Sequence, residues 1–317
     1  MNTRGIKTII IVLLCAANLF FLYNTFLLNR RVRYISADMI YNAAAILTAE
    51  HGVEVLPQHV LARRPVHYIY EFIYSPDENY HSIVRSFSGA TDEEVRRGRR
   101  IDIIHDDSIA FNVGEYRFRF DDFMLLEIVR SDYWDGDTAG KMDMLADFYT
   151  EFSAAEANRL SGIINGFLGR YAGQSPMMGF NIIGLRHEGG RDEVLINQTM
   201  DGLLISSHTA LVIISDCIDG SRSGRGVKYF SGRWYFGDFV GYYETPLLDS
   251  VNILFRSLEQ DGALLRGAQL VNMEKQYSIM PHQIDRFYLA LSWVLSFDDG
   301  ISVRSFSYDM ITGYRNN

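Results

Sequence analysis

The chain opens with a long hydrophobic segment, which is the strongest pattern in the sequence. Residues 9–28, IIIVLLCAANLFFLYNTFLL, form a run of 20 residues without a charge. As a helix with a rise of about 1.5 Å per residue, this run is ~30 Å long and matches the hydrocarbon core of a bilayer. A cleaved signal peptide has a shorter apolar core that ends at small residues, whereas Ala16-Ala17 lies mid-segment. The pattern therefore predicts a retained transmembrane anchor within residues 1–33.

The charges that flank this segment leave its orientation close to a tie. Two basic residues precede it, and Arg30, Arg31 and Arg33 follow it. Because a long domain crosses the membrane largely regardless of flanking charge, we expect a cytoplasmic N-terminus, one span in the cell membrane and an extracytoplasmic body. Asn18 and Asn24 lie within the span, and amides in lipid form hydrogen bonds to neighbouring helices. They are the candidate intramembrane contacts with a partner.

Periodicity predicts three helices in the remaining chain, each followed by strands. Apolar residues recur with helical spacing over 36–50, 153–171 and 246–262. A capping-box pattern begins at Ser153, and another at Thr91 predicts one helical turn over 91–97. Strand patterns are found at 66–75, 79–87, 101–105, 108–120, 179–186, 193–199, 203–215, 227–239, 264–279, 286–296 and 301–307.

This order predicts an α+β fold, with one N-terminal transmembrane helix followed by repeated helix-plus-antiparallel-sheet modules. Most gaps between strands are too short for the crossover helices of a parallel sheet. The polar segment 132–141 is the predicted lobe boundary. The expected divisions are a cytoplasmic tip and anchor in 1–33, a first α+β lobe in 34–135 and a second in 136–317. The second lobe is either one unit or two modules, 136–245 and 246–317.

Net charge argues against nucleic acid as a partner. The chain has 30 Lys and Arg against 39 Asp and Glu, a net charge of −9. Five basic residues and no acid lie in residues 1–33, so the body carries 25 basic and 39 acidic residues, or −14. Binding to phosphate backbones requires a basic surface. The two cysteines, Cys15 and Cys217, show no metal-ligand spacing.

No motif in the chain predicts catalysis, a cofactor or a metal site. The glycine-rich stretch 220–226 lacks the Lys-Ser/Thr ending of a Walker loop and the third glycine of a dinucleotide loop. His208 and Cys217 lie on or beside one apolar strand, which favours a buried thiol and a histidine with satisfied hydrogen bonds over a catalytic pair. We therefore expect a protein that is not an enzyme. The basic residues that stand out as candidate surface contacts are Arg96, Arg97, Arg99, Arg100, Arg222 and Arg225.

Several short motifs resemble the YycI/YycH group of membrane-anchored regulators. The segment KTIIIVLLCAANLFFLY at 7–23 is similar to the start of that family, and ILTAEHGVEV at 46–55 is similar to its leading helix. After Pro246, a leucine-rich helix precedes a strand at 268–277. The chain then reaches YDMITG at 308–313, similar to the PepSY-like ending of YycI proteins.

The resemblance implies a non-catalytic, anchored extracytoplasmic regulator of a WalK–WalR-type two-component system. Such a protein associates with a sensor histidine kinase through transmembrane and extracytoplasmic contacts and shifts its signalling state. It leaves open whether a second YycH/YycI-type anchored regulator shares the complex. Two alternatives also stay open: an anchored binding or peptidase-inhibitor-like module unrelated to a kinase, and an anchored hydrolase.

Overall fold

The fold is known here from a computed structural model. It describes residues 14–15, 18–23, 34–62, 68–73, 76–102, 108–121, 125–133, 148, 151–171, 177–216, 225–235, 238–245, 247–283 and 286–316. The predicted lobe boundaries after residues 33 and 135 lie outside these ranges and stay predictions.

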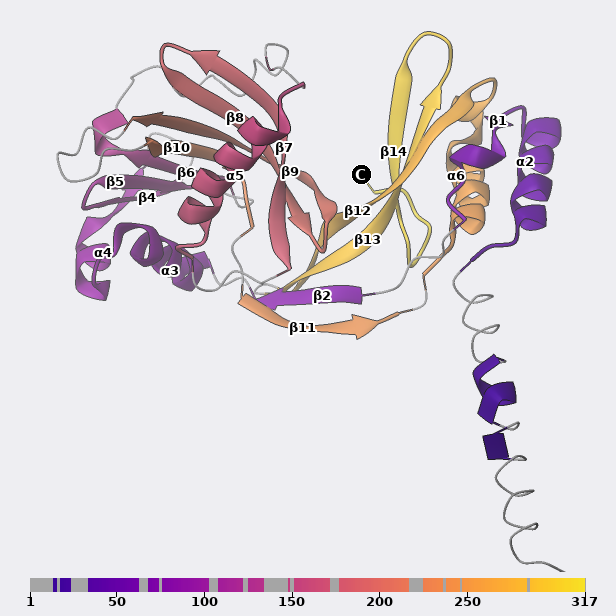
Figure 1. The fold of residues 1–317 in the computed structure, drawn as a ribbon, viewed down its shortest axis with the longest axis horizontal. Coiled ribbons are helices and arrows are strands. Elements are labelled where there is room, and N and C mark those ends of the chain that lie inside the picture. The colour runs from indigo at the N-terminus through magenta and orange to yellow at the C-terminus, as the bar shows by residue number, and fades with distance from the viewer. Residues whose placement is uncertain are drawn as a thin grey trace, which may run out of the picture. The chain divides into compact units, whose positions relative to one another are not determined.

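The chain forms two compact units, each assembled from separate segments (Figure 1). Unit 1 comprises residues 1–68, 243–275 and 291–317. Unit 2 comprises residues 69–242 and 276–290. Strands β12 (Gln269–Gln283) and β13 (Arg286–Asp298) contribute residues to both units.

Unit 1 combines two helices with strands from both ends of the chain. Its remaining elements are α2 (Ala37–His51), β1 (Glu54–Val55), the 3₁₀ turn η1 (Pro57–His59), α6 (Ser250–Leu265) and β14 (Val303–Asp309). Helix α2 begins at the N-cap Ser36 and ends at Gly52, whose φ of 67° is left-handed. It packs against α6. Strand β1 pairs in parallel with β12, and β13 pairs antiparallel with β14.

The C-terminal residues of unit 1 are hydrogen-bonded to α6. The hydroxyl of Tyr308 donates to Asp261 Oδ2 at 2.7 Å, and Arg315 Nη1 lies 2.9 Å from Asp261 Oδ1. The backbone N–H of Arg315 also donates to Gln260, whose amide donates to the carbonyl of Gly313. These bonds give the buried carboxylate of Asp261 two partners from the end of the chain.

Unit 2 is a long sheet with helices packed on it. Its hydrogen-bonded strand order is β11-β2-β13-β12-β9-β10-β6-β5-β4-β3, with β8 also beside β9 and β7 beside β8. The strands are β2 (Tyr68–Ile73), β3 (Arg99–Asp102), β4 (Ser108–Val113), β5 (Tyr116–Phe120), β6 (Leu125–Arg130), β7 (Met178–Glu188), β8 (Arg191–Met200), β9 (Leu203–Asp216), β10 (Arg225–Arg233) and β11 (Asp238–Glu244). The helices are α3 (Pro76–Ser88), α4 (Asp92–Gly98), η3 (Ser131–Tyr133) and α5 (Ala154–Leu168).

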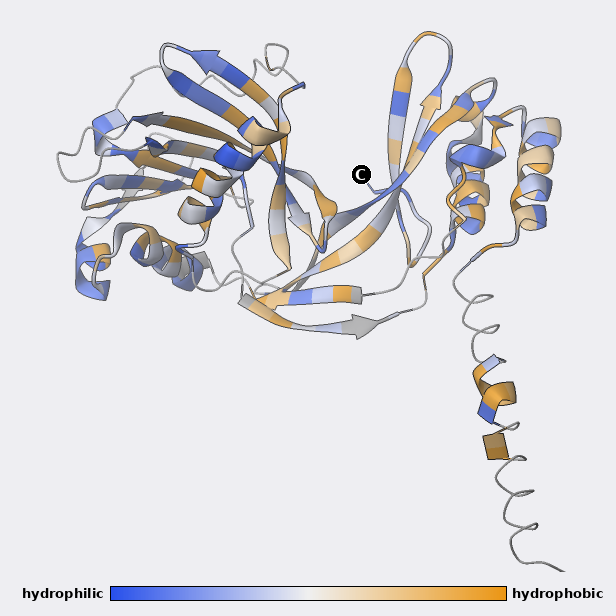
Figure 2. Cartoon of the chain, viewed as in Figure 1, coloured by the Kyte–Doolittle hydropathy of each residue, from blue (hydrophilic) through white to orange (hydrophobic). Residues whose placement is uncertain are grey.

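Helix α5 covers the sheet through its apolar stripe, as the sequence predicts. Leu160, Ile164 and Phe167 are buried, and the Phe167 ring lies 6.0 Å from that of Phe230 on β10. Helix α4 has the predicted complete capping box at Thr91. It is largely hydrophilic, as Figure 2 shows.

The predicted fold class is wrong. Among the described residues strand outweighs helix, the sheet is mixed, and the helices do not head repeated antiparallel modules. Tyr277 of β12 pairs in parallel with Ile205 of β9, and Glu54 of β1 with Gln269 of β12. These partners are far apart in the sequence, so the short gaps between consecutive strands say nothing about them.

A second prediction is also wrong: one segment predicted as a strand forms a helix. Residues 79–87 lie in α3, where Tyr80, Ile83, Val84 and Phe87 are buried. Their spacing of three, one and three residues is that of a single helical face. The segment HSIVRSF at 81–87 was misread as a strand because it is too short to separate the two periods.

The predicted single-pass membrane anchor is contradicted. Among the described parts of the chain, none of the helices has the length and apolar character needed to cross a bilayer. Asn18 is described and exposed, whereas Asn24 lies outside the described residues.

Candidate functional site

The basic residues singled out from the sequence lie in two places. Arg96, Arg97 and Arg99 are exposed at α4 and the start of β3, and Arg97 pairs with Glu93 one turn earlier. Arg100 is described in its backbone only, and Arg222 lies outside the described residues. As contacts with a partner, these residues stay predictions.

Arg225 belongs to a charge cluster around the buried carboxylate of Asp192 on β8. Its Nη1 lies 3.0 Å from Asp192 Oδ2, and Arg159 of α5 reaches the same oxygen at 3.0 Å. Burial alone raises the pKa of Asp192. Hydrogen bonds from Arg159 and His187 and the charge of Arg225 outweigh burial and hold the pKa of Asp192 below its ordinary value. Arg225 is thus engaged within unit 2.

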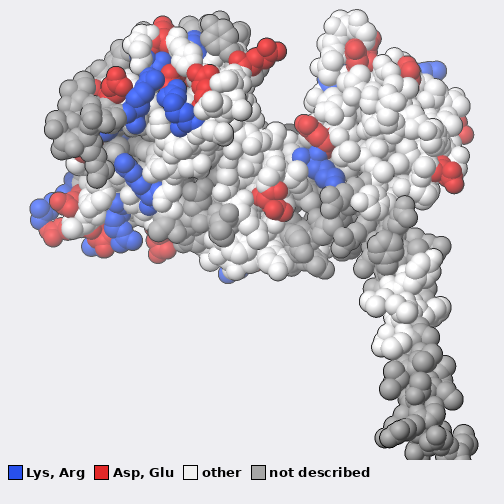
Figure 3. Space-filling view, in the orientation of Figure 1, with Lys and Arg blue, Asp and Glu red and all other residues white. Residues whose placement is uncertain are grey.

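The neighbouring Glu193 extends this cluster. Its carboxylate is fully buried and accepts a hydrogen bond of 2.8 Å from Arg186 Nε, and Arg191 Nε lies 3.2 Å away. Figure 3 shows basic side chains in a band flanked by acidic ones on this part of unit 2. Because the charges compensate one another, the band is a structural network on β7, β8 and β10 rather than a free cationic patch.

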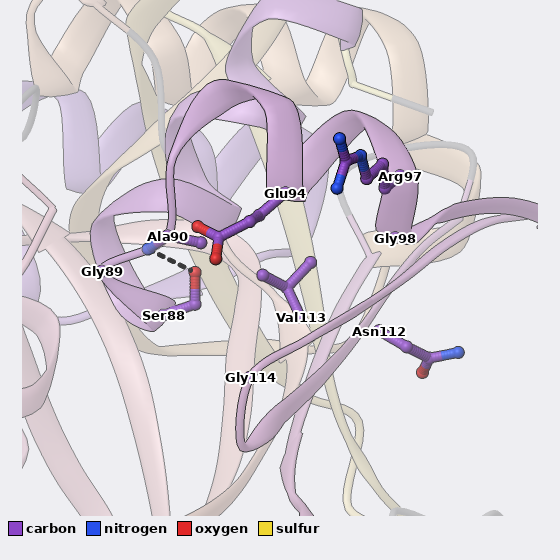
Figure 4. Close-up of a pocket in the computed structure, with 9 residues that line it drawn as sticks. All are labelled: Ser88, Gly89, Ala90, Glu94, Arg97, Gly98, Asn112, Val113 and Gly114. Atoms are coloured by element: carbon purple, nitrogen blue, oxygen red, sulfur yellow. Dashed lines mark hydrogen bonds between the residues drawn. The ribbon is translucent and has the colours of Figure 1, made fainter.

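A polar pocket of about 420 Å³ lies between the α3–α4 connection and the β4–β5 turn (Figure 4). It is lined by Ser88, Gly89, Ala90, Glu94, Arg97, Gly98, Asn112, Val113 and Gly114. Both charged side chains are engaged within the chain, because Glu94 caps α4 and Arg97 pairs with Glu93. Hydrogen bonds from Thr91 lower the pKa of Glu94 and keep it ionised for this role. The pocket offers no charged group that is held for a ligand.

An aromatic edge, formed by β11 and the rings beneath it, is the feature best suited to binding. Figure 1 shows β11 beside β2 at the end of the strand path. Phe239, Val240 and Tyr242 on β11 are exposed, Tyr242 by 57%. Large apolar side chains in a row on an edge strand are unusual, because natural edges are blunted by charges or proline.

Buried rings hold these exposed side chains in place. Tyr70 of β2 is buried, and its ring lies 6.2 Å from that of Phe239 and 6.4 Å from that of Tyr242. On its other side, Tyr70 contacts Tyr277 of β12 at 5.6 Å. Burial, together with the neighbouring Tyr70, raises the pKa of Tyr277 far above its ordinary value, so its hydroxyl stays neutral. Edge-to-face rings of this kind form a rigid base.

Sequence reasoning missed the aromatic edge. The alternation over 66–75 places Tyr70 on an apolar strand face, but it does not show which strand lies beside it. Tyr70, Tyr242 and Tyr277 come from three segments far apart in the chain. The available signal was the aromatic density of DFVGYYE at 238–244, but the predicted strand 227–239 ended at Phe239 and residues 240–244 were assigned to no element. Among the described residues, no group of three His, Cys, Asp or Glu side chains is arranged to hold a metal ion.

Comparison with known proteins leaves the family undetermined. No protein-family model matches the chain, and no curated protein matches it. Twelve chains of solved structures match it, among them the following two. An uncharacterized protein from Eubacterium rectale is 11% identical, covering 85% of this chain and 92% of its own, with a TM-score of 0.43. The YpeB C-terminal domain of Bacillus megaterium is 10% identical, covering 78% and 97%, with a TM-score of 0.30. Likenesses this weak do not establish a shared fold, and none points to a YycI or YycH protein or to a kinase.

Proposed function

We propose that this protein is a non-enzymatic binding module that holds an extended segment of a partner protein along β11. The observation that carries the proposal is the aromatic edge, where Phe239, Val240 and Tyr242 are exposed on a strand at the end of the path. A segment added beside β11 would pair with its backbone N–H and C=O groups, and its apolar side chains would cover the exposed ones.

The rigidity of the rings under β11 supports this function. Tyr70, Phe72 and Tyr277 are buried; Tyr70 contacts Tyr277, and Phe72 contacts Phe239 of β11. Because these rings are already fixed, little of their side-chain entropy is lost when a partner binds. Tyrosine, with tryptophan and arginine, is also among the residues that most often dominate binding energy at interfaces. Association with a histidine kinase rests only on the resemblance in the sequence, so the identity of the partner stays a prediction.

Peptide selection tests the proposal. Peptides from a random displayed library are selected on the immobilised full chain, and their affinity is then measured by fluorescence anisotropy. We expect Tyr242→Ala to weaken the selected peptides at least about tenfold, or ~1.4 kcal/mol. Hydrogen exchange should show new protection of β11 amides in the complex.

A matched control separates binding at this surface from nonspecific binding to exposed aromatic side chains. Tyr314 is 68% exposed in unit 1, away from β11 in the sequence, and Tyr314→Ala should leave the affinity unchanged. The proposal is wrong if the selected peptides bind Tyr242→Ala as tightly as the wild type, or if they protect other strands. Self-association through β11, detected by analytical ultracentrifugation and abolished by Tyr242→Ala, would instead identify a second copy as the occupant.

A further inference from the structure

Two helices of unit 2 start with the same four-residue pattern but form different caps. At α4, Thr91 accepts from the backbone N–H of Glu94, and Glu94 accepts in return from the backbone N–H of Thr91 at 2.8 Å. At α5, Ser153 accepts from the backbone N–H of Glu156 at 3.2 Å, but the return bond from Ser153 to Glu156 is not formed. The box at α5 is therefore half closed.

The side chain of Glu156 is turned to a histidine instead. Its Oε1 lies 3.0 Å from Nε2 of His187, which is half exposed near the end of β7. The other ring nitrogen of His187, Nδ1, lies 2.7 Å from Oδ1 of Asp192. Both nitrogens of one imidazole thus face carboxylate oxygens.

This arrangement is complete only in one protonation state. A neutral imidazole has one N–H and cannot donate to two carboxylates, whereas the imidazolium donates from both nitrogens. Asp192 is buried and also held by Arg159 and Arg225, so its bond to Nδ1 is the better fixed of the two. When His187 loses its proton, the lone pair therefore faces Glu156, and two acceptors are opposed.

We propose that Glu156 is a proton-operated latch between α5 and the β7–β8 hairpin. With His187 charged, Glu156 ties the first turn of α5 to β7. With His187 neutral, Glu156 turns back to the free backbone N–H of Ser153 and closes the same capping box that is seen at Thr91. The helix N-terminus favours a carboxylate in that position. Histidine changes charge between about pH 5 and 8, so the latch operates in that range.

The charges around His187 decide which of its neighbours can change partner. The groups on the packed elements are Glu156 and Arg159 of α5, Arg186 and Glu188 of β7, Arg191, Asp192 and Glu193 of β8, Asp216 of β9 and Arg225 of β10. Arg186 and Arg191 are committed to Glu193, and Arg159 and Arg225 to Asp192. Among these groups, Glu156 is the acid paired with His187 alone, and this leaves it free to change partner.

Titration by nuclear magnetic resonance of the full chain tests the latch without any substitution. We expect the backbone amide proton of Ser153 to shift downfield as the pH rises from 5 to 8, with the same midpoint as the His187 ring proton. The amide of Thr91, whose box is already closed and has no histidine partner, should not move through this range.

Two variants make the assignment specific. In Glu156→Gln, the Ser153 amide should lose its titration. In His187→Asn, the Ser153 amide should keep its high-pH position at every pH. The latch is refuted if His187 titrates while the Ser153 amide stays fixed, or if that amide still titrates in Glu156→Gln. The binding role of β11 is unaffected by either result.

Discussion

His208 is a buried histidine in β9 whose charge state is coupled to folding. Its Nδ1 lies 2.7 Å from the carbonyl oxygen of Ser206, and its Nε2 has no hydrogen-bond partner among the described residues. Burial lowers the pKa of His208; the Ser206 carbonyl opposes this shift, and the charge of Arg233 adds to it. The sequence predicted a histidine whose hydrogen bonds are satisfied; the structure buries His208 but gives a partner to Nδ1 alone among the described residues. Cys217, its imagined catalytic partner, lies outside the described residues.

We predict that His208 makes folding weaker in acid. Below about pH 6.5 the unfolded chain protonates this histidine while the folded chain does not, so the free energy of unfolding falls as the pH drops. His208→Gln should remove this part of the pH dependence. Urea unfolding at pH 8 and pH 5.5 measures it, with the same substitution at exposed His51 as the control. Equal slopes for wild type and His208→Gln would show that the folded protein also accepts the proton.

At the scale of elements, three helix starts were predictable, whereas the partners of strands were not. The ends of α6 were also missed, because the helix predicted over 246–262 begins at Ser250 and ends at Leu265. Ser36, Thr91 and Ser153 are N-caps because a cap depends only on the next three residues. The contact of Glu156 with His187 was not predictable, since it joins α5 to a strand that lies 31 residues later in the chain (187 minus 156). A capping-box pattern in a sequence therefore does not show where its glutamate points.

A glycine fixes the close approach of β10 to β9. Gly232 pairs with Ala210, and a Cβ at this position would overlap the carbonyl oxygen of Thr209 and the backbone of Ala210. We predict that Gly232→Ala lowers the free energy of unfolding by about 1–3 kcal/mol, through overpacking. Denaturant unfolding measures the change.

The matched control is a glycine in a helix. Gly162 of α5 has open space where its Cβ would lie, so Gly162→Ala should raise the free energy of unfolding by about 0.5–1 kcal/mol. If both substitutions are neutral, the contact between β9 and β10 at Gly232 is looser than the structure shows.

At the scale of the whole molecule, both units are made of distant segments, which no local pattern reports. The alternating residues of β2 and the aromatic residues of β11 were visible in the sequence. Their meeting at Tyr70 depends on a strand order that starts β11-β2-β13-β12. For the same reason, the candidate residues chosen from the sequence were two asparagines of the predicted anchor and clusters of arginines, which local inspection finds easily, rather than the aromatic edge.

The end of the chain is predicted to stabilise unit 1. Asp261 is buried and accepts a hydrogen bond from Tyr308. The burial of Tyr308 and the charge of Asp261 raise the pKa of Tyr308, so the tyrosine hydroxyl keeps its proton and remains a donor. Arg315→Ala removes the cation that neutralises Asp261 and should lower the free energy of unfolding by about 1–3 kcal/mol. Chemical denaturation measures this effect, and hydrogen exchange of the α6 amides shows whether it is local to that helix.

Two further variants define that result. Arg304 pairs with Asp299 at an exposed position, so Arg304→Ala should cost less than about 1 kcal/mol. Adding Asp261→Asn to Arg315→Ala should recover part of the loss, because the unpaired charge is removed. A double variant that is less stable than Arg315→Ala alone would assign the effect to lost packing over Phe306 instead.

The parallel pairing of β1 with β12 has a consequence for synthesis on the ribosome. Glu54 meets Gln269, so 215 residues (269 minus 54) are translated between the two partners. At roughly 5–20 residues per second, the early strand waits on the order of ten to forty seconds for its neighbour. All of residues 69–242 emerge during that interval. Strand β1 must therefore stay unpaired with this partner, and within reach of chaperones, until Gln269 has been translated.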